Sequence, residues 1–136
     1  MALFYVDSSA FVKLVREEPE SAALRAFLAG ADLLCSELAL AEVPRAIRRA
    51  AATDPRLPLD LLLERAAELL EAVALMALDR VLVEAAGALA EPALRTLDAI
   101  HVIAAVELSP LDALVTYDER QAAAARLAGL RTVSPA

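Results

Sequence analysis

Short apolar runs alternate with longer amphipathic stretches from one end of the chain to the other. The runs are bounded by turn residues and predict strands over Leu3–Val6, Asp32–Cys35, Ala74–Leu78, Ala113–Tyr117 and Arg131–Ser134. The stretches between them predict helices over Ala10–Arg16, Pro19–Gly30, Glu37–Ala51, Leu59–Glu71, Arg80–Ala90, Leu97–Leu108 and Asp118–Ala128. Strands that alternate with helices in this way indicate an α/β fold, with a central parallel sheet of about five strands flanked by helices on both faces.

Capping residues and helix breakers mark the ends of these elements. Ser36 and Thr96 are N-cap candidates for the third and sixth predicted helices. Pro44 lies inside the third predicted helix and should kink it or delay its start. Gly129 follows the last predicted helix, where a C-terminal stop is expected. Because the chain contains no flexible linker and no repeat, we expect residues 1–136 to form a single domain.

Composition narrows the class of protein. Hydrophobic residues make up 60% of the chain, and many of them are alanine, which favours helix. Cys35 is the only cysteine, so the chain has no internal disulfide, which fits a reducing compartment. No charge-free run approaches the ~20 residues of a membrane span, and no basic segment precedes an apolar one at the start. We therefore expect a cytoplasmic protein with no membrane partner.

The formal net charge of −7 comes from 20 acidic and 13 basic residues. A protein that coats nucleic acid needs positive charge, so this balance argues against that function. It does not exclude an enzyme that meets nucleic acid through bound metal ions.

Four acidic residues fall where parallel sheets bind ligands, outside the carboxyl ends of the strands. Asp7 follows the first predicted strand and Asp118 follows the fourth, so the two are neighbours if those strands pair. Glu42 lies on the helix after the second strand, and Asp98 lies in the helical turn after Thr96. Carboxylates gathered in one cleft repel one another unless a cation neutralises them or some stay protonated, and oxygen ligands suit Mg²⁺ or Mn²⁺. Such a site suits phosphodiester hydrolysis, because the ion activates water and offsets charge at the phosphate.

Each acid also has a purely structural interpretation. Asp7 and Asp118 are residue types that commonly cap helices. Asp98 is favourable in a first helical turn because of the helix dipole. Glu42 can pair with Arg45 three residues further on, and exposed pairs of this kind are common and weak. Only the placement of all four acids at one edge favours a functional site.

The other reactive residues are weaker candidates. His101 lies three residues after Asp98, a spacing that can bind metal, but a lone histidine in an apolar helix more often packs in the core. Without a second histidine, a zinc site is disfavoured. Ser8 or Ser9 can be combined with His101 into a nucleophilic triad, yet the chain has no GxSxG turn. Cys35 is expected in the core.

Four segments, in order, carry a family pattern: YVDSSAFVKL, SELALAEVPRAIRR, LRTLDAIHVIAA and ALVTYDERQAAAARLAGLRTVSP. Together they resemble the VapC-type PIN-domain ribonuclease toxins, and the resemblance covers almost the whole chain. Asp7 matches the first metal-binding aspartate of that family, Glu42 its glutamate and Asp98 its third acid. Thr116 and Asp118 stand in the matching places of the last segment.

The resemblance implies a PIN-like three-layer fold and an Mg²⁺- or Mn²⁺-dependent endoribonuclease. It also implies the toxin component of a type II toxin–antitoxin pair, a homodimer, and a small antitoxin protein that blocks the site. By the same resemblance, Asp7 and Asp98 would coordinate the principal ion, and Asp118 would coordinate or support it. Glu42 would hold a water on the ion or act as a general base toward it.

Three further residues are assigned auxiliary roles. The Ser8 and Thr116 hydroxyls would orient the carboxylates, and Arg95 would contact an RNA phosphate, although Arg95 is equally a surface charge at a helix start. The high apolar fraction suggests surface that a partner covers, and the predicted helix over Leu59–Glu71 is one candidate.

Two other functions remain open at this point. A phosphotransfer domain is disfavoured because Ser9 stands where a phosphatase needs a second aspartate, and because Lys13, the only lysine, is too early for a receiver domain. A non-catalytic α/β interaction module, with its acids acting as helix caps, predicts no effect of divalent metal on stability. The nuclease predicts stabilisation, because a ligand favours the state that binds it.

Overall fold

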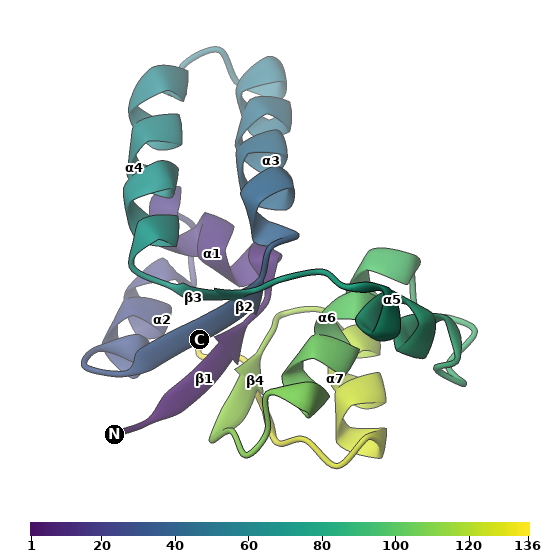
Figure 1. The fold of residues 1–136 in the computed structure, drawn as a ribbon. Helices are drawn as coiled ribbons and strands as arrows, with labels where there is room; N and C mark the ends of the chain where they lie inside the picture. The colour runs from purple at the N-terminus through teal and green to yellow at the C-terminus, as the bar shows by residue number, and fades with distance from the viewer.

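The computed structural model describes residues 1–136 and contains every predicted strand and helix (Figure 1). The strands are β1 (Leu3–Val6), β2 (Asp32–Ser36), β3 (Ala74–Met76), β4 (Ala113–Val115) and β5 (Thr132–Val133). The helices are α1 (Ser8–Val15), α2 (Ser21–Leu28), α3 (Ala39–Thr53), α4 (Leu59–Glu71), α5 (Arg80–Gly87), α6 (Thr96–Glu107) and α7 (Glu119–Leu127). The α/β class predicted from the alternation of apolar and amphipathic segments is confirmed.

The five strands form one parallel sheet in the order β3-β2-β1-β4-β5. The chain first moves outward from β1 to β3, then crosses to β4 on the other side of β1 and moves outward again to β5. Because crossovers between parallel strands are right-handed, this reversal places α1 to α4 on one face and α5 to α7 on the other (Figure 1). The direction of winding therefore switches between β1 and β4. Because these two strands pair, Asp7 and Asp118 follow neighbouring strands.

Several predicted ends and caps are wrong. Ser36 ends β2, and its hydroxyl accepts a bond from the Leu38 N–H at 3.3 Å, so that α3 starts at Ala39 rather than Glu37. Pro44 lies inside α3, well after the helix begins at Ala39, so the prediction that it delays the start of the helix is wrong. Thr96 does not cap α6, because it is already helical.

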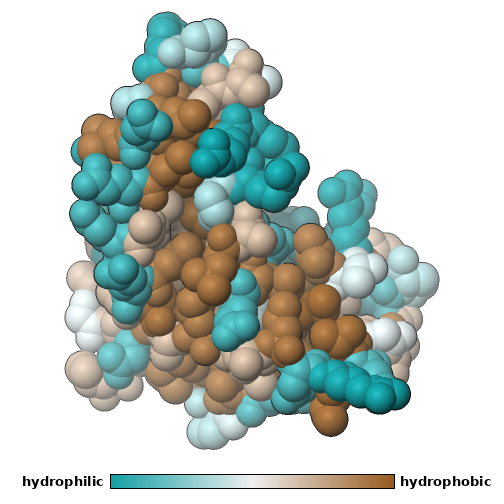
Figure 2. Space-filling view, turned by 45° about the horizontal axis from the view of Figure 1, so that its top comes forward, coloured by the Kyte–Doolittle hydropathy of each residue, from teal (hydrophilic) through white to brown (hydrophobic).

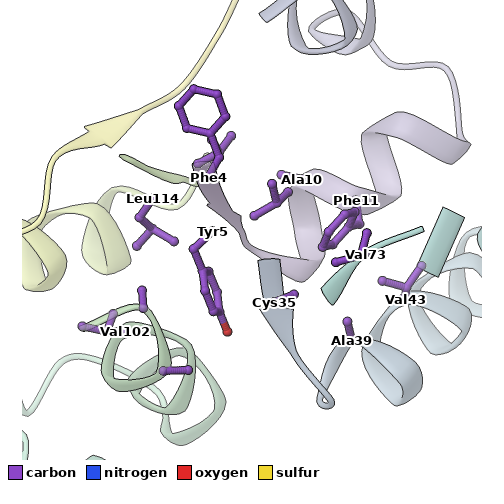
Figure 3. Packing of buried hydrophobic residues seen from close by; sticks show 14 of the residues in the cluster. Phe4, Tyr5, Ala10, Phe11, Cys35, Ala39, Val43, Val73, Val102 and Leu114 are labelled. Carbon is purple, nitrogen blue, oxygen red and sulfur yellow. The ribbon is translucent and has the colours of Figure 1, made fainter. Parts of the chain in front are cut away.

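The core lies on both faces of the sheet, because successive strand side chains point in opposite directions. On one face, the Phe4 ring lies 4.8 Å from that of Phe27 in α2. On the other, Tyr5 lies between Val102 of α6 and Cys35 of β2 in the buried interior (Figure 3). Tyr5, Cys35 and His101 have no exposed surface, so the predicted core positions of Cys35 and His101 are confirmed.

Helices α3 and α4 project from the sheet as an antiparallel pair (Figure 1). Apolar side chains are spread over the middle of the face seen in Figure 2, with charged groups around them. Between α3 and α4 lies a groove of about 470 Å³, lined mostly by apolar side chains that include Leu40, Leu63 and Leu70. None of the helices is both long and apolar enough to cross a bilayer.

Candidate metal centre

Asp7 stands at the junction of β1 and α1, where the sheet changes winding direction. Its backbone N–H donates to the Val115 carbonyl at 3.0 Å, which fixes this junction to the end of β4. The side chain caps α1 by accepting from the Ser9 N–H at 3.2 Å and from the Ser9 hydroxyl. Its other oxygen accepts from the Gln121 amide at 3.3 Å. Asp7 is only 5% exposed, so these bonds hold a nearly buried carboxylate in one orientation.

Glu42 reaches the same edge from the first turn of α3. Its Oε1 accepts from the Ser8 hydroxyl at 2.8 Å and from His101 Nε2 at 2.6 Å. Burial opposes the charge of this carboxylate, but the bonds from His101 and Ser8 and the positive charge of Arg49 outweigh burial. The pKa of Glu42 is therefore below its usual value, and the side chain stays ionised at neutral pH.

Behind Glu42, a buried chain of hydrogen bonds fixes His101. An ionised carboxylate only accepts, so Nε2 must carry the proton that it donates to Glu42. On the other side of the ring, Nδ1 lies 2.7 Å from the Tyr5 hydroxyl, and that hydroxyl accepts from the Ser36 N–H at 3.1 Å. Burial lowers the pKa of His101, but Cys35, the bond to Glu42 and the charge of the nearby Asp7 raise it more, so the net shift is upward.

This arrangement also decides against a serine nucleophile. The Ser8 oxygen lies 3.2 Å from His101 Nε2, as a triad would require. However, Nε2 is the protonated nitrogen, and Ser8 gives its own hydrogen to Glu42. His101 therefore has no lone pair with which to deprotonate Ser8.

Asp98 lies in the first turn of α6 and is half-buried. Burial raises the pKa of its carboxyl group, and the negative charges of Asp7 and Asp118 raise it further. No side chain or backbone N–H donates to this carboxylate, whereas the Asp98 carbonyl accepts from the Gln121 amide at 3.4 Å. Asp98 is therefore a carboxylate under repulsion from its neighbours, without a donor that compensates it.

Asp118 is exposed and caps α7 through one oxygen, Oδ1, which accepts from the N–H groups of Arg120 and Gln121 at 2.9 and 3.0 Å. Oδ2 takes no part in the cap. Asp7 and Asp118 thus do act as caps, as their structural interpretation predicted, and each lies at the carboxyl end of the sheet as well.

The four acids approach one another without forming a closed cluster. The charges of Asp7, Asp118 and Glu42 all act on Asp98, which places the four at one edge. No three histidine, cysteine or acidic side chains, however, are gathered as they would be around an ion. The set of ligand atoms fits a hard divalent cation, because it consists of carboxylate oxygens and because the Asp98 carboxylate accepts no hydrogen bond from the chain.

The PIN domain family matches residues 4–127 of the chain. The chain belongs to the PIN-domain family. Two relatives from Mycobacterium tuberculosis match nearly its full length. Ribonuclease VapC47 of strain CDC 1551 / Oshkosh is 34% identical over 139 residues, covering 98% of this chain and 97% of the relative. Ribonuclease VapC46 of strain ATCC 25618 / H37Rv is 38% identical over 137 residues, covering 99% of each. These relatives confirm the resemblance to VapC-type PIN domains.

A solved structure shares the fold. PAE2754 from Pyrobaculum aerophilum superposes with a TM-score of 0.69 at 20% identity, and the match covers 97% of this chain and 84% of that one. The sheet and helices of this PIN domain are therefore an arrangement that a crystal structure also displays.

Two residues of this PIN domain bind Asp7 although the sequence did not predict that role for them. Gln121 is fully buried and donates to Asp7, while its own oxygen accepts from the Thr116 hydroxyl at 2.6 Å. Thr116 thus acts on a carboxylate through Gln121, and it also accepts from the Asp118 N–H at 3.2 Å. Ser9, the second missed residue, binds Asp7 directly. A polar residue on the buried, alanine-rich side of α7 was the one available signal for Gln121.

Arg95 occupies the N-cap position of α6 and makes no side-chain capping bond. It is exposed, and its side chain forms no ion pair with any of the four acids. Its proposed contact with RNA phosphate stays a prediction.

Proposed function

We propose that this PIN domain is an Mg²⁺- or Mn²⁺-dependent endoribonuclease that hydrolyses RNA phosphodiester bonds. The observation that carries the proposal is Asp98, a half-buried carboxylate that accepts no hydrogen bond and is repelled by Asp7 and Asp118, a repulsion that the charge of His101 offsets only in part. The relatives that span the full chain are named ribonucleases. A cation at this edge would remove the repulsion and bring the positive charge that a phosphodiester substrate needs.

In this proposal Asp7 and Asp98 hold the principal ion, and Asp118 coordinates or supports it through the oxygen left free by its cap. The bound ion would supply Lewis-acid chemistry, lowering the pKa of water and offsetting charge at the phosphate. Gln121 keeps Asp7 pointed at the site, and the Thr116 hydroxyl keeps Gln121 in place.

Glu42 is the proposed general base toward the attacking water. Its lowered pKa keeps it ionised, so it can accept a proton at neutral pH. Ser8 and His101 hold one of its oxygens, Oε1, and leave the other for a water. Arg95 is proposed to contact an RNA phosphate at the start of α6.

We further propose that residues 1–136 act as one domain in the toxin component of a type II toxin–antitoxin pair. A helix of the small antitoxin protein fits the groove between α3 and α4, where apolar side chains line about 470 Å³. A homodimer would cover other exposed apolar residues, of which Val81 is 70% and Leu127 75% exposed.

One observation favours a different function. Asp7 and Asp118 cap their helices, which is all that a non-catalytic interaction module would need of them. The two functions differ in their response to metal, because only the nuclease gains stability from binding Mg²⁺ or Mn²⁺.

The decisive experiment incubates purified, antitoxin-free protein with mixed-sequence RNA in Mn²⁺, in Mg²⁺ and in EDTA. We expect cleavage with metal that is lost in EDTA and in Asp98→Asn. Asp60→Asn is the matched control, because Asp60 also lies in the first turn of a helix but is exposed on α4. Retained cleavage by Asp98→Asn, or metal that leaves the melting temperature unchanged, would contradict the proposal.

A further inference from the structure

A groove leads away from the acidic edge along α1. One hollow of about 420 Å³ is lined by Ser9, Val12, Arg16, Ala46, Tyr117 and Asp118, among others. A smaller hollow of about 120 Å³ shares Ser9, Val12 and Ala46 with it and continues to Glu42 and Arg49. The two hollows therefore form one continuous path that passes the carboxylates Asp118 and Glu42.

Arg16 is unlike the other arginines of the chain. Each of the others is exposed, whereas Arg16 is half-buried at the end of α1. No carboxylate lies within ion-pair distance of its guanidinium group, and Asp54, on which its charge acts, is already paired with Arg56 at 3.0 Å. A half-buried guanidinium without an anion is costly, and a phosphate oxygen pair is the ligand that its planar fork matches.

The part of the hollow that Tyr117 lines is already held in place by other contacts. Lys13 is already neutralised by Glu18 at 3.4 Å and Glu20 at 3.0 Å, and its Nζ lies 4.8 Å from the centre of the Tyr117 ring. The Tyr117 hydroxyl donates to the Pro135 carbonyl at 2.6 Å. The hydroxyl and one ring face of Tyr117 are thus held, so the ring loses little conformational entropy on binding.

We propose that this groove is the subsite for the RNA nucleotide next to the cleaved bond. It rests on the proposed nuclease function. In this subsite Arg16 binds the flanking phosphate with two of its guanidinium nitrogens, and the side of Tyr117 lining the groove packs against the sugar or base. Arg49 contacts the RNA chain at the end of the groove where Glu42 lies. These contacts are to the phosphate and sugar of the RNA and to the faces of its bases, not to the base edges. The subsite therefore binds single-stranded RNA without reading its sequence.

Binding is measured first, with a fluorescent single-stranded RNA and protein carrying Asp98→Asn so that the RNA stays intact. We expect Arg16→Ala to weaken binding roughly tenfold and to reduce the slope of log affinity against log salt by about 0.7, the effect of one lost phosphate contact. Arg16→Lys, which keeps the charge and loses the fork, should recover part of the affinity. Arg65→Ala is the control, because Arg65 is exposed on α4 and lines neither hollow.

Kinetics then separate this inference from the nuclease proposal. In an otherwise unaltered protein, Arg16→Ala should raise KM about tenfold and change kcat by less than about twofold, because the contact exists before and during the reaction. Cleavage by the unaltered protein together with an unchanged KM in Arg16→Ala would overturn the subsite and leave the nuclease standing. Absence of any metal-dependent cleavage would overturn the nuclease and with it a subsite beside a cleaved bond, whereas RNA binding that depends on Arg16 would then support the groove as an RNA-binding site alone. Equal losses in Arg16→Ala and Arg65→Ala would overturn the subsite.

Discussion

Replacing His101 by leucine should destabilise the fold and disable Glu42 at the same time. Leucine has nearly the volume of histidine and no polar atom, so the change removes bonds and leaves packing almost intact. It removes the 2.6 Å bond to Glu42, which is partly exposed, and the fully buried 2.7 Å contact with the Tyr5 hydroxyl.

The magnitude follows from these contacts. A hydrogen bond to a charged group contributes ~1.5–3 kcal/mol, and a buried hydroxyl that loses its partner costs ~1–3 kcal/mol. The expected loss for His101→Leu is therefore about 3–5 kcal/mol. A domain of 136 residues is stable by ~7–20 kcal/mol, so the variant should remain folded in the absence of denaturant.

Urea unfolding in EDTA measures the loss, and a double-mutant cycle with Tyr5→Phe tests its origin. The Tyr5–His101 contact is lost in each single variant but only once in the double variant. The losses of unfolding free energy in the two single variants should therefore add up to about 1–2 kcal/mol more than the loss in the double variant. In the cleavage assay His101→Leu should lower kcat, because Glu42 loses the bond that orients it. Val102→Ala is the control, since Val102 is fully buried on the same helix and its apolar side chain cannot bond to Glu42. A loss below about 1 kcal/mol, or strictly additive single losses, would refute the network as described.

Three further predictions concern the same edge. Asp98→Asn should raise the melting temperature in the absence of metal, because the raised pKa of Asp98 indicates a carboxylate that destabilises the fold when it is ionised. The same variant should lose the stabilisation by Mn²⁺. A melting temperature below that of the unaltered protein in EDTA would contradict this prediction. Gln121→Leu should cost about 1–2 kcal/mol and weaken Mn²⁺ binding in titration calorimetry, since Asp7 loses its amide donor. The Glu42–His101 pair should stabilise most between pH 4.5 and 6.5, the ordinary pKa values of the two groups. Its contribution fades as pH falls through the lowered pKa of Glu42, and as pH rises through the raised pKa of His101. The pH profile of the difference between wild type and His101→Leu in EDTA tests this, and a flat difference would contradict it.

The sequence by itself determined the elements and their class. Apolar runs and helical spacing follow from backbone geometry over a few residues, so Leu3–Val6 and Leu59–Glu71 were predicted with both ends right. The N-cap residues could not be predicted in the same way. A hydroxyl such as that of Ser36 or Thr96 can bond to the backbone of a turn, cap a helix or do neither. Acids placed after strands were also visible, since one rule of parallel sheets puts ligands at that edge.

Only the tertiary structure decided which of these residues meet. His101 and Glu42 are 59 residues apart in the chain, Tyr5 and His101 are 96 apart, and Gln121 and Asp7 are 114 apart. No local pattern encodes such pairs, because the partner of a side chain depends on strand order and on how α3, α6 and α7 pack against the sheet. The sequence thus supplied the four carboxylates, and the packing around β1 and β4 supplied the histidine, the glutamine and the groove that surround them.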